Sequence, residues 1–343
     1  MLRGCIFIVL SVAGWMEVCR AGEDLAAAFE RLLAADGEEY VEARRRFLAM
    51  PRAGEYLKRL REQRVDWRRD ALAGACLLQL EQARELESLM KDEQLIGGFG
   101  DDLIRALDRR DYRWAGDLQA RWLLRKASKL GIRDDLLTSY LTERLLKSYR
   151  HPDWGAHMEA LYLRSPDRDI RLAGERMIRE EPRLWRIVAI QGLRVIGTPE
   201  QVPPLVAVAV GSEDAPSREL ALRALSCLQD RPAKGKKTPT ADGKGFWCVG
   251  GGPPRHEWEK RDVVFTDGQM QILWQTLLVA LQVDSSQAVR IAAAESLGRN
   301  PRFVPAIPFL KTAIAEMPEG EVRTAAERSL AILEAAKARR TGK

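Results

Sequence analysis

The chain has 343 residues, of which 30% are charged and 46% are hydrophobic, and its formal net charge is +6. This length can build one large core or two ordinary domains, and the composition is normal for a soluble helical protein. The 55 Lys and Arg residues are interspersed with 49 Asp and Glu residues. The sequence therefore disfavours a dedicated nucleic-acid binder, which concentrates its basic residues in one segment or on one face.

The first 21 residues have the layout of a secretory signal peptide. A short positive start precedes a mostly apolar run at 5–18, and Cys19 and Ala21 supply small residues for a cut after Ala21. The run is shorter than the about 20 residues that a membrane-spanning helix needs. Glu17 within the run weakens the interpretation as a signal peptide and the interpretation as a membrane-spanning helix. We expect an exported protein, periplasmic or extracellular, with no transmembrane segment after cleavage. The alternative is a hydrophobic first helix that is retained.

Residues 22–164 form an N-terminal helical region, in which we expect degenerate repeats. Strong helix formers and apolar residues at helical spacing predict helices over 23–35, 38–49, 53–64, 67–91, 101–109, 112–130, 134–149 and 153–163. Glycines at 97, 98 and 100 interrupt this series. The repeat number of this half is not given by the sequence, because no regular period appears before residue 165.

Residues 165–338 carry a regular repeat. Four arginines are each followed by an alanine three residues on and a leucine seven residues on: Arg186, Ala189, Leu193; Arg218, Ala221, Leu225; Arg290, Ala293, Leu297; and Arg323, Ala326, Leu330. The spacings between the arginines are 32, 72 and 33, and the middle one becomes 33 when the 39 residues of 229–267 are removed. A fixed period of this length predicts stacked helix pairs, in which the small residue permits close approach and the leucine fills the layer between repeats. We expect each arginine to tie turns together through backbone carbonyls.

Proline and glycine mark the ends of the repeat helices. Ser165-Pro166-Asp167 predicts the start of a helix that runs to Arg179, and Gly197 with Pro199 predicts the end of the Arg186 helix. Apolar partner helices are expected over 202–210, 271–281 and 304–314. The predicted fold is all-α, an α-solenoid of stacked antiparallel helix pairs with one long loop insertion.

Two of these segments resemble a known repeat family. Asp284–Gly298, DSSQAVRIAAAESLG, resembles a HEAT repeat of the short kind found in bilin-lyase-like and many bacterial HEAT proteins, and Pro318–Leu330, PEGEVRTAAERSL, is similar. The resemblance covers roughly residues 165–335. It implies a HEAT/armadillo-like solenoid with a concave surface that binds protein, and it carries no catalytic residues to this chain.

The insertion at 229–267 differs from the rest of the chain. Residues 231–244 are basic, rich in chain-breaking residues and without large apolar side chains, so we expect a mobile loop. Aromatic and β-branched runs at 245–249 and 261–266 flank a Gly/Pro turn and are compatible with a small hairpin. The candidate interaction residues of this loop are Lys234, Lys236, Lys237, Trp247, His256 and Trp258. The alternative is an insertion that the fold tolerates without using it.

Removal of residues 1–21 leaves three cysteines, Cys76, Cys227 and Cys248. A bridge between Cys227 and Cys248 would close a loop worth about 3 kcal/mol in the chain-entropy model. Three unpaired thiols are the alternative, since an export compartment only permits disulfides. Cys76 stands in an apolar run that indicates a buried helix face.

Two groups of residues invite a chemical interpretation. His151, Asp153 and His157 offer metal ligands within a short span, but no further ligand is near, so a helix cap with a surface histidine is favoured. Cys248 and His256 would make a thiolate–imidazole pair, although the glycines between them argue against a preorganised site. We therefore expect no cofactor, no metal and no catalytic set.

The leading functional hypothesis is an exported, non-enzymatic HEAT-repeat scaffold that mediates protein–protein interaction. Its partner is an unknown protein, and no specific nucleic acid is expected. One alternative is an enzyme or enzyme accessory of the same compartment that uses the 229–267 insertion. Another is a nucleic-acid-binding HEAT protein, which the basic loop and the pI of about 9.1 support.

Overall fold

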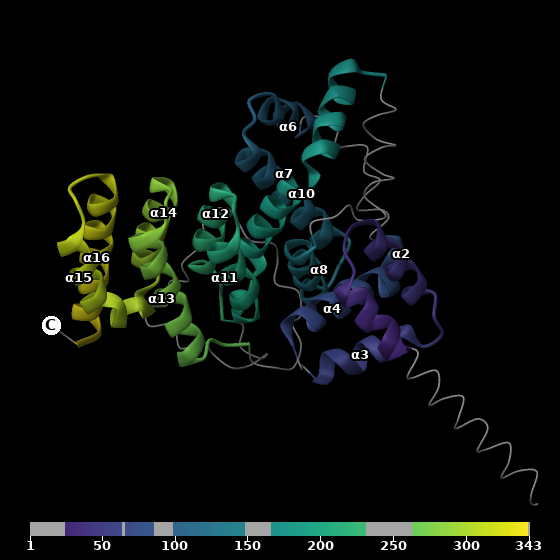
Figure 1. The fold of residues 1–343 in the computed structure, drawn as a ribbon, viewed down its shortest axis with the longest axis horizontal. Helices are drawn as coiled ribbons and strands as arrows, with labels where there is room; N and C mark the ends of the chain where they lie inside the picture. The colour runs from purple at the N-terminus through teal and green to yellow at the C-terminus, as the bar shows by residue number, and fades with distance from the viewer. Residues whose placement is uncertain (1–24, 64–65, 86–98, 148–165, 231–262, 342–343) are drawn as a thin grey trace, which may run out of the picture.

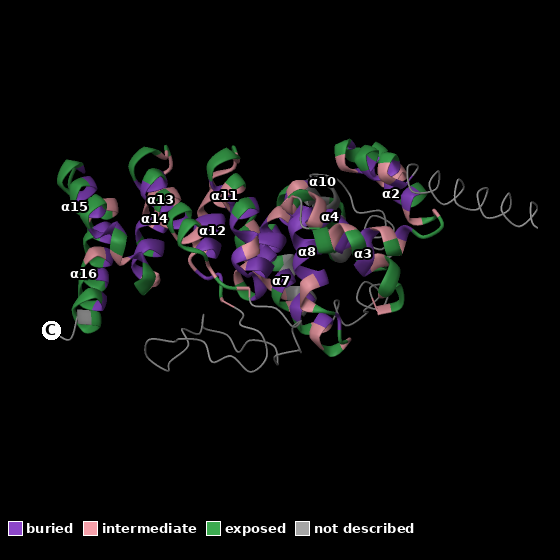
Figure 2. Cartoon of the chain, turned by 90° about the horizontal axis from the view of Figure 1, so that it is seen from below, coloured by how far each residue is buried: buried purple, intermediate pink, exposed green. Residues whose placement is uncertain are grey.

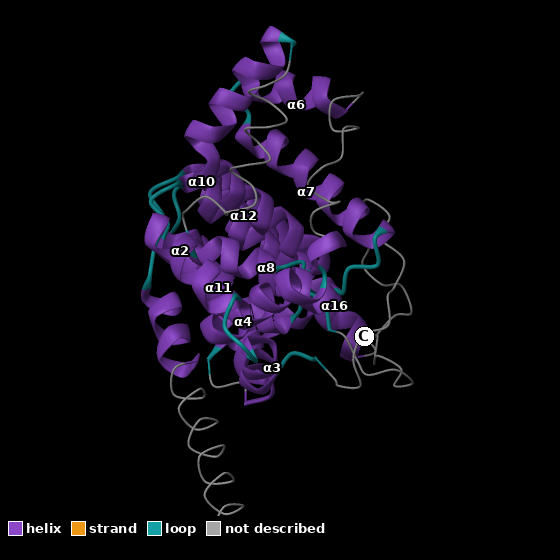
Figure 3. Ribbon diagram, turned by 90° about the vertical axis from the view of Figure 1, so that its right-hand side faces the viewer, coloured by secondary structure: helices purple, strands orange, loops and turns teal. Residues whose placement is uncertain are grey.

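The computed structural model describes residues 25–63, 66–85, 99–147, 166–230 and 263–341. Within these ranges the chain is helical and contains no strand (Figures 1 and 3). This confirms the all-α prediction. None of the helices in these ranges is long and apolar enough to cross a membrane.

The first helices of the chain pack in series, and α4 joins them to a buried central helix, α8. A helix at residues 25–34 leads into α2 (Gly37–Leu48), α3 (Ala53–Gln63) and α4 (Trp67–Glu81). α3 packs on α4, which packs on α8 (Asp134–Leu146). Leu136 to Leu145 of α8 are all buried, so this helix is enclosed on every side. An enclosed helix must bury its polar side chains as well, and α8 pairs several of them with other helices.

α10 (Arg168–Ile196) connects the two halves of the molecule. It contacts α6 (Phe99–Asp108), α7 (Tyr112–Lys129) and α8 of the N-terminal half and α12 (Ala215–Leu225) of the repeat half. Figures 1 and 3 show α7 alongside α10. The predicted end of a helix at Arg179 is wrong, because α10 is one helix of 29 residues that continues through Pro182. A proline inside a helix costs one backbone hydrogen bond, and the contacts of α10 as a whole with α7, α8 and α12 favour the continuous helix.

The repeat half consists of helices that alternate between two rows (Figure 1). One row contains α11 (Val202–Gly211), α13 (Asp267–Val283) and α15 (Ile307–Glu316), and the other contains α12 (Ala215–Leu225), α14 (Gln287–Arg299) and α16 (Glu321–Thr341). Short 3₁₀ helices η3 (Pro199–Gln201) and η4 (Pro301–Ala306) precede α11 and α15. Neighbours within each row contact one another, and α11, α13 and α15 each contact the helix that follows them. The predicted partner helices therefore all form, although the one expected over 304–314 begins as η4.

The packing positions of the repeat are occupied as predicted. The four alanines are completely buried: Ala189, Ala221, Ala293 and Ala326. Leu193, Leu225 and Leu297 are at most 1% exposed, and Leu330 on the last helix is partly buried. At Gly298 the backbones of α14 and α16 come so close that an added Cβ would lie 3.0 Å from Ser329 Cα. Small residues thus set the distance between neighbouring repeats.

The two ends of the insertion meet at one point of the stack. Asp230 accepts a hydrogen bond from the backbone N–H of Phe265 at 2.7 Å and pairs with Arg302 at 2.7 Å. The segment therefore leaves and re-enters the fold at neighbouring positions. Residues 231–244, which we expect to be mobile, lie wholly outside the described residues, and the expected hairpin at 245–266 lies largely outside them. Both stay predictions.

Candidate interaction face

Three of the four repeated arginines bond backbone carbonyls as predicted, whereas Arg186 donates to the Ser212 side-chain hydroxyl at 3.4 Å. Arg218 donates to the Ser212 and Glu213 carbonyls at 2.8 and 3.1 Å, and Arg290 donates to the Leu281 carbonyl at 2.8 Å. Arg323 reaches the Met317 carbonyl at 3.3 Å. Arg218 and Arg323 tie the start of their helices to the end of the preceding helix or the turn after it, and Arg290 ties α14 to the last turn of α13, so all three are engaged within the fold.

Arg218 also forms an ion pair between repeats. Its Nε and Nη2 atoms donate to the two carboxylate oxygens of Asp284 at 2.8 and 2.9 Å. These bonds, with one from the Ser286 backbone N–H, hold the pKa of the Asp284 carboxyl below its usual range. A two-pronged pair of this kind fixes the geometry between the α12 helix and the turn before α14.

The row of α11 and α13 is unusual for its lack of charge. In a chain with 30% charged residues, the ten residues of α11 have none and the 17 residues of α13 have one, Asp267 at the first position. Solvent-exposed helices normally carry charged residues on their outer side. The outer sides of α11 and α13, which carry almost no charge, are therefore a candidate surface for contact with another molecule.

This row exposes several apolar side chains beside polar ones, the latter being Gln271, Gln275 and Gln282 of α13 and Lys311 of α15. Val210 is 68% exposed, Val279 53% and Val283 73%, with Ile272 at 47% and Phe309 of α15 at 55%. Pro203 and Ala207 complete the outer side of α11. We call these seven residues the apolar face: Pro203, Ala207, Val210, Ile272, Val279, Val283 and Phe309. In Figure 2, α11, α13 and α15 lie along one edge of the molecule and carry exposed residues there.

The hydroxyl groups on this row are turned back into their own helices. Thr276 Oγ1 donates to the Ile272 carbonyl at 2.8 Å, and Thr312 Oγ1 donates to the Pro308 carbonyl at 3.2 Å. Trp274 of α13 stacks on Phe309 with ring centroids 5.3 Å apart. The aromatic contact ties α15 to α13 and continues the apolar face onto a third helix.

The opposite row presents charge instead. Arg113 of α7 pairs with Glu219 of α12 at 3.0 Å, Glu219 pairs with Arg223 at 3.0 Å, and Arg223 pairs with Glu295 of α14 at 2.6 Å. This chain of alternating charges crosses three helices and satisfies itself within the protein. Glu219 and Arg223 are 12% and 14% exposed and only Arg113 and Glu295 are exposed, so these charges serve contacts between helices, and the apolar face is the candidate interaction site.

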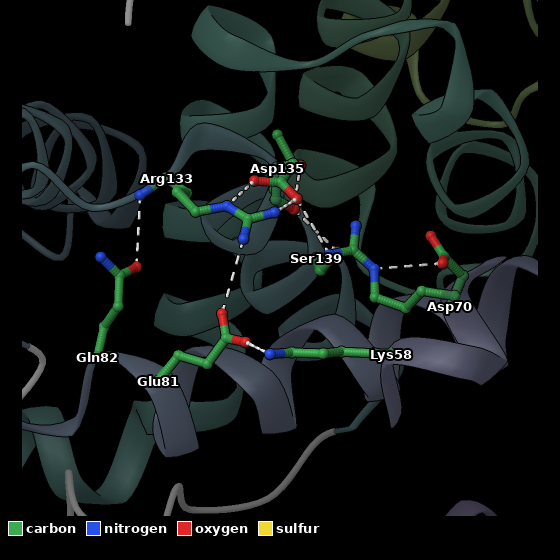
Figure 4. Close-up of polar contacts among 9 residues, drawn as sticks. Lys58, Asp70, Glu81, Gln82, Arg133, Asp135 and Ser139 are labelled. Atoms are coloured by element: carbon green, nitrogen blue, oxygen red, sulfur yellow. Dashed lines mark hydrogen bonds and ion pairs between the residues drawn. The ribbon is translucent and has the colours of Figure 1, made fainter. Parts of the chain in front are cut away.

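The N-terminal half contains a second ionic network, drawn in Figure 4. Asp135 at the start of α8 accepts hydrogen bonds from Arg133 at 3.0 and 2.8 Å and from Arg61 at 3.0 Å. Arg61 also reaches Asp70, and Arg133 reaches Glu81. Burial raises the pKa of Asp135, but the two guanidinium groups outweigh it and hold that pKa below its usual range. The network joins α3, α4 and α8 and serves the packing of this half.

A buried polar cluster lies between α2, α4 and α8. Arg44 donates to Tyr40 at 3.0 Å, to the Ala75 carbonyl at 3.2 Å and to Gln79 at 2.9 Å, and its Nη1 lies 3.2 Å from Glu143 Oε1. The Tyr40 hydroxyl donates to the same Glu143 oxygen at 2.5 Å. Arg44 and Glu143 are 1% and 0% exposed, so this cluster holds helices together rather than meeting a ligand.

The predicted site residues of the insertion lie outside the described residues: Lys234, Lys236, Lys237, Trp247, Cys248, His256 and Trp258. The same is true of His151, Asp153 and His157. Among the residues that the structure describes, no group of three or more His, Cys, Asp or Glu is placed to hold a metal ion. These assignments therefore stay predictions.

The two described cysteines are both buried. Cys76 is completely buried, as its apolar surroundings predicted, and burial raises the pKa of its thiol to about 11. It therefore lacks the thiolate character of a reactive cysteine at neutral pH. Cys227 lies just beyond α12, and the bridge to Cys248 stays a prediction.

The sequence patterns indicated a candidate site in the insertion and did not indicate the apolar face. The signal was present in the composition of the two helices, since one charged residue in α11 and α13 together is far below the rest of the chain. Without the structure, the same pattern is equally expected of helices buried on all sides. Comparisons with protein-family models, curated proteins and solved structures found no match for this chain.

Proposed function

We propose that the chain is an exported, non-enzymatic α-solenoid scaffold of HEAT-like helix pairs that binds protein through the apolar face. The observation that carries this proposal is the exposure of Val210, Val279 and Val283 on helices with almost no charge. Burying such side chains in a protein contact is favourable, whereas leaving them in water carries a cost.

Several features support a binding role over catalysis. The strongest ionic and polar groups of the described residues, such as Arg44 with Glu143 and Arg218 with Asp284, are occupied within the fold. The buried Cys76 thiol has a raised pKa, so it is a poor nucleophile. A stack of helix pairs also offers an extended, rigid surface of the kind that suits a macromolecular partner.

A co-purification experiment tests the binding role. The protein is recovered from its native host as wild type, as Val279→Asp/Val283→Asp, and as Ala288→Asp, a matched change at an exposed position of α14. Partners should be lost with the double variant and kept with the α14 control. Equal recovery of the same partners by all three proteins would contradict the proposal.

Export is tested separately by N-terminal sequencing of the protein from its host. Cleavage after Ala21 gives a mature chain that starts at Gly22. A chain that retains Met1 would overturn the export part of the proposal and leave the binding part standing.

A further inference from the structure

The segment around α7 holds the positive excess of the chain. Between residues 105 and 133 the sequence has nine Lys and Arg residues, three Asp residues and no Glu, an excess of six that equals the net charge of the whole chain. The two signs balance over the rest of the sequence. Figure 3 shows α7 along the outer edge of the molecule, where it contacts α6 and α10. We call three exposed cations of this helix, Arg121, Arg125 and Lys129, the basic ridge.

The three cations of the basic ridge form one line along α7. They are four residues apart, so successive side chains lie one turn apart on the same side of the helix, over a length of about 12 Å. Arg121 is 66% exposed and pairs with Asp117 of its own helix at 2.7 Å. Among the described residues, no carboxylate pairs with Arg125 or Lys129. The basic ridge therefore carries charge that the fold does not neutralise.

Apolar side chains lie beside the basic ridge. Trp114, Leu118 and Trp122 are also four residues apart, and each precedes cations of the ridge by three or seven residues, which places both rows on one side of the helix. All three are half-buried, and the two tryptophans pack against the core with the rest of their rings. The outer side of α7 thus offers a row of positive charges next to a row of partly exposed apolar groups.

These two rows define the chemistry of a ligand. Cations that the fold leaves without a carboxylate attract carboxylates or phosphates, and the apolar row adds contact for a ligand with apolar groups of its own. A partner helix with a carboxylate at every fourth residue repeats the spacing of the ridge, about 6 Å, so three ion pairs form in one register. Apolar residues on the same side of that helix would cover the partly exposed tryptophans.

Nucleic acid and lipid fit this surface less well. A phosphate backbone is negative along its whole length, whereas Asp108, Asp111 and Asp117 lie among the cations of this segment. Bases stack on a ring with an open face, but Trp114 and Trp122 are packed against the core. Membrane-surface helices bury an exposed apolar side in the lipid, and the apolar groups of α7 are half-buried in the protein.

We infer that the basic ridge is a docking site for an acidic amphipathic helix of a partner protein, with carboxylates on the three cations and apolar side chains against the row from Trp114 to Trp122. The site lies on α7 and is separate from the apolar face. The inference therefore goes beyond the proposed function and does not depend on it, and each can fail while the other stands.

Fluorescence anisotropy with a labelled peptide tests the site. The probe is a helical peptide of about 15 residues with Glu at every fourth position and Leu beside it, and the control peptide has the same composition in scrambled order. The periodic peptide should bind about fivefold more tightly or better, and salt should weaken its binding. No binding of the periodic peptide at about 100 μM protein, or equal binding of both peptides, would overturn the inference.

Charge reversal identifies the surface. Arg125→Glu/Lys129→Glu should weaken binding of the periodic peptide about tenfold or more, because two attractions become repulsions. Arg45→Glu/Arg46→Glu on α2 is the matched control, since it changes the net charge equally at side chains that are 68% and 78% exposed. This control should bind like wild type. An equal loss in both variants would mean attraction to net charge alone and would overturn the site.

A reversed peptide and two other anions complete the test. The periodic peptide with Lys in place of Glu should prefer Arg125→Glu/Lys129→Glu to wild type, and circular dichroism confirms that each variant is folded. A single-stranded DNA of about 20 nucleotides and vesicles with anionic lipid are measured with the same proteins. If either binds more tightly than the periodic peptide and is lost in Arg125→Glu/Lys129→Glu, the ridge is a nucleic-acid or lipid site and the inference falls.

Discussion

A single arginine, Arg44, joins three helices of the N-terminal half. Its side chain bonds Tyr40 on its own helix, Ala75 and Gln79 on α4, and lies beside Glu143 on α8, all in a buried environment. Removing one member of a buried pair leaves the other charge without compensation. We therefore expect substitutions within this cluster to lower the free energy of unfolding more than other substitutions in these three helices.

Arg44→Met should lower the free energy of unfolding by about 3–5 kcal/mol, as expected for a broken buried pair. Arg45→Met is the matched control on the same helix, because Arg45 is 68% exposed and pairs only at the surface with Glu42. That control should change stability by less than about 1 kcal/mol. Urea unfolding of the three proteins measures the difference, and equal losses for both variants would contradict a structural role of the cluster.

The Arg218–Asp284 pair makes the free energy of unfolding depend on pH in the acid range. The pKa of Asp284 is lowered in the folded protein by Arg218, so its contribution is complete above the ordinary value of about 3.9 and is lost as pH falls through the lowered pKa. Asp284→Asn should cost about 1–3 kcal/mol at pH 7 and progressively less below pH about 4. Glu319→Gln, at an exposed position, is the control. A cost of Asp284→Asn that is constant from pH 7 to pH 3 would contradict this role.

At the scale of elements, the repeat was predictable and the long helix was not. The alanine three residues after each repeated arginine marked the helices that pack against a neighbouring repeat. Only a small side chain at that position permits the two helices to come close. The predicted helix end at Arg179 is wrong because α10 runs on to Ile196, and the contacts of α10 with α7, α8 and α12 favour one continuous helix.

The close approach of α12, α14 and α16 can be tested at Ala293. Ala293→Leu should destabilise the protein by about 1–3 kcal/mol, because Ala293 is completely buried and the extra volume must displace neighbouring helices. Ala288→Leu on the same helix is exposed and should have little effect. Thermal unfolding compares the two, and similar midpoints would argue against tight packing between the repeats.

The insertion should be dispensable for folding. Asp230 and Phe265 are already joined by a 2.7 Å hydrogen bond, so a short linker can replace residues 231–262 without moving either end. Replacement by four residues under reducing conditions should leave the free energy of unfolding unchanged or raise it by up to about 2 kcal/mol, from the smaller loop entropy. A loss of more than about 2 kcal/mol would show that the insertion contributes to the stack.

At the scale of the whole molecule, the two rows of the repeat half divide the surface by chemistry. The α12 and α14 side is charged and internally paired, whereas the α11 and α13 side exposes apolar side chains and uncharged amides with almost no charge. Sequence patterns located both sets of helices but not their outward sides, since which side of a helix meets solvent depends on neighbours distant in sequence. The candidate site therefore emerged only when the helices were placed together.

We propose that the apolar face is covered by protein in the working molecule. The most direct measurement is photo-crosslinking in the native host, with a photoreactive residue at Val279 or, as a control, at Ala288 of α14. We expect a discrete crosslinked protein at position 279 and none at 288. Crosslinking absent at 279, or equal at the two positions, would contradict it.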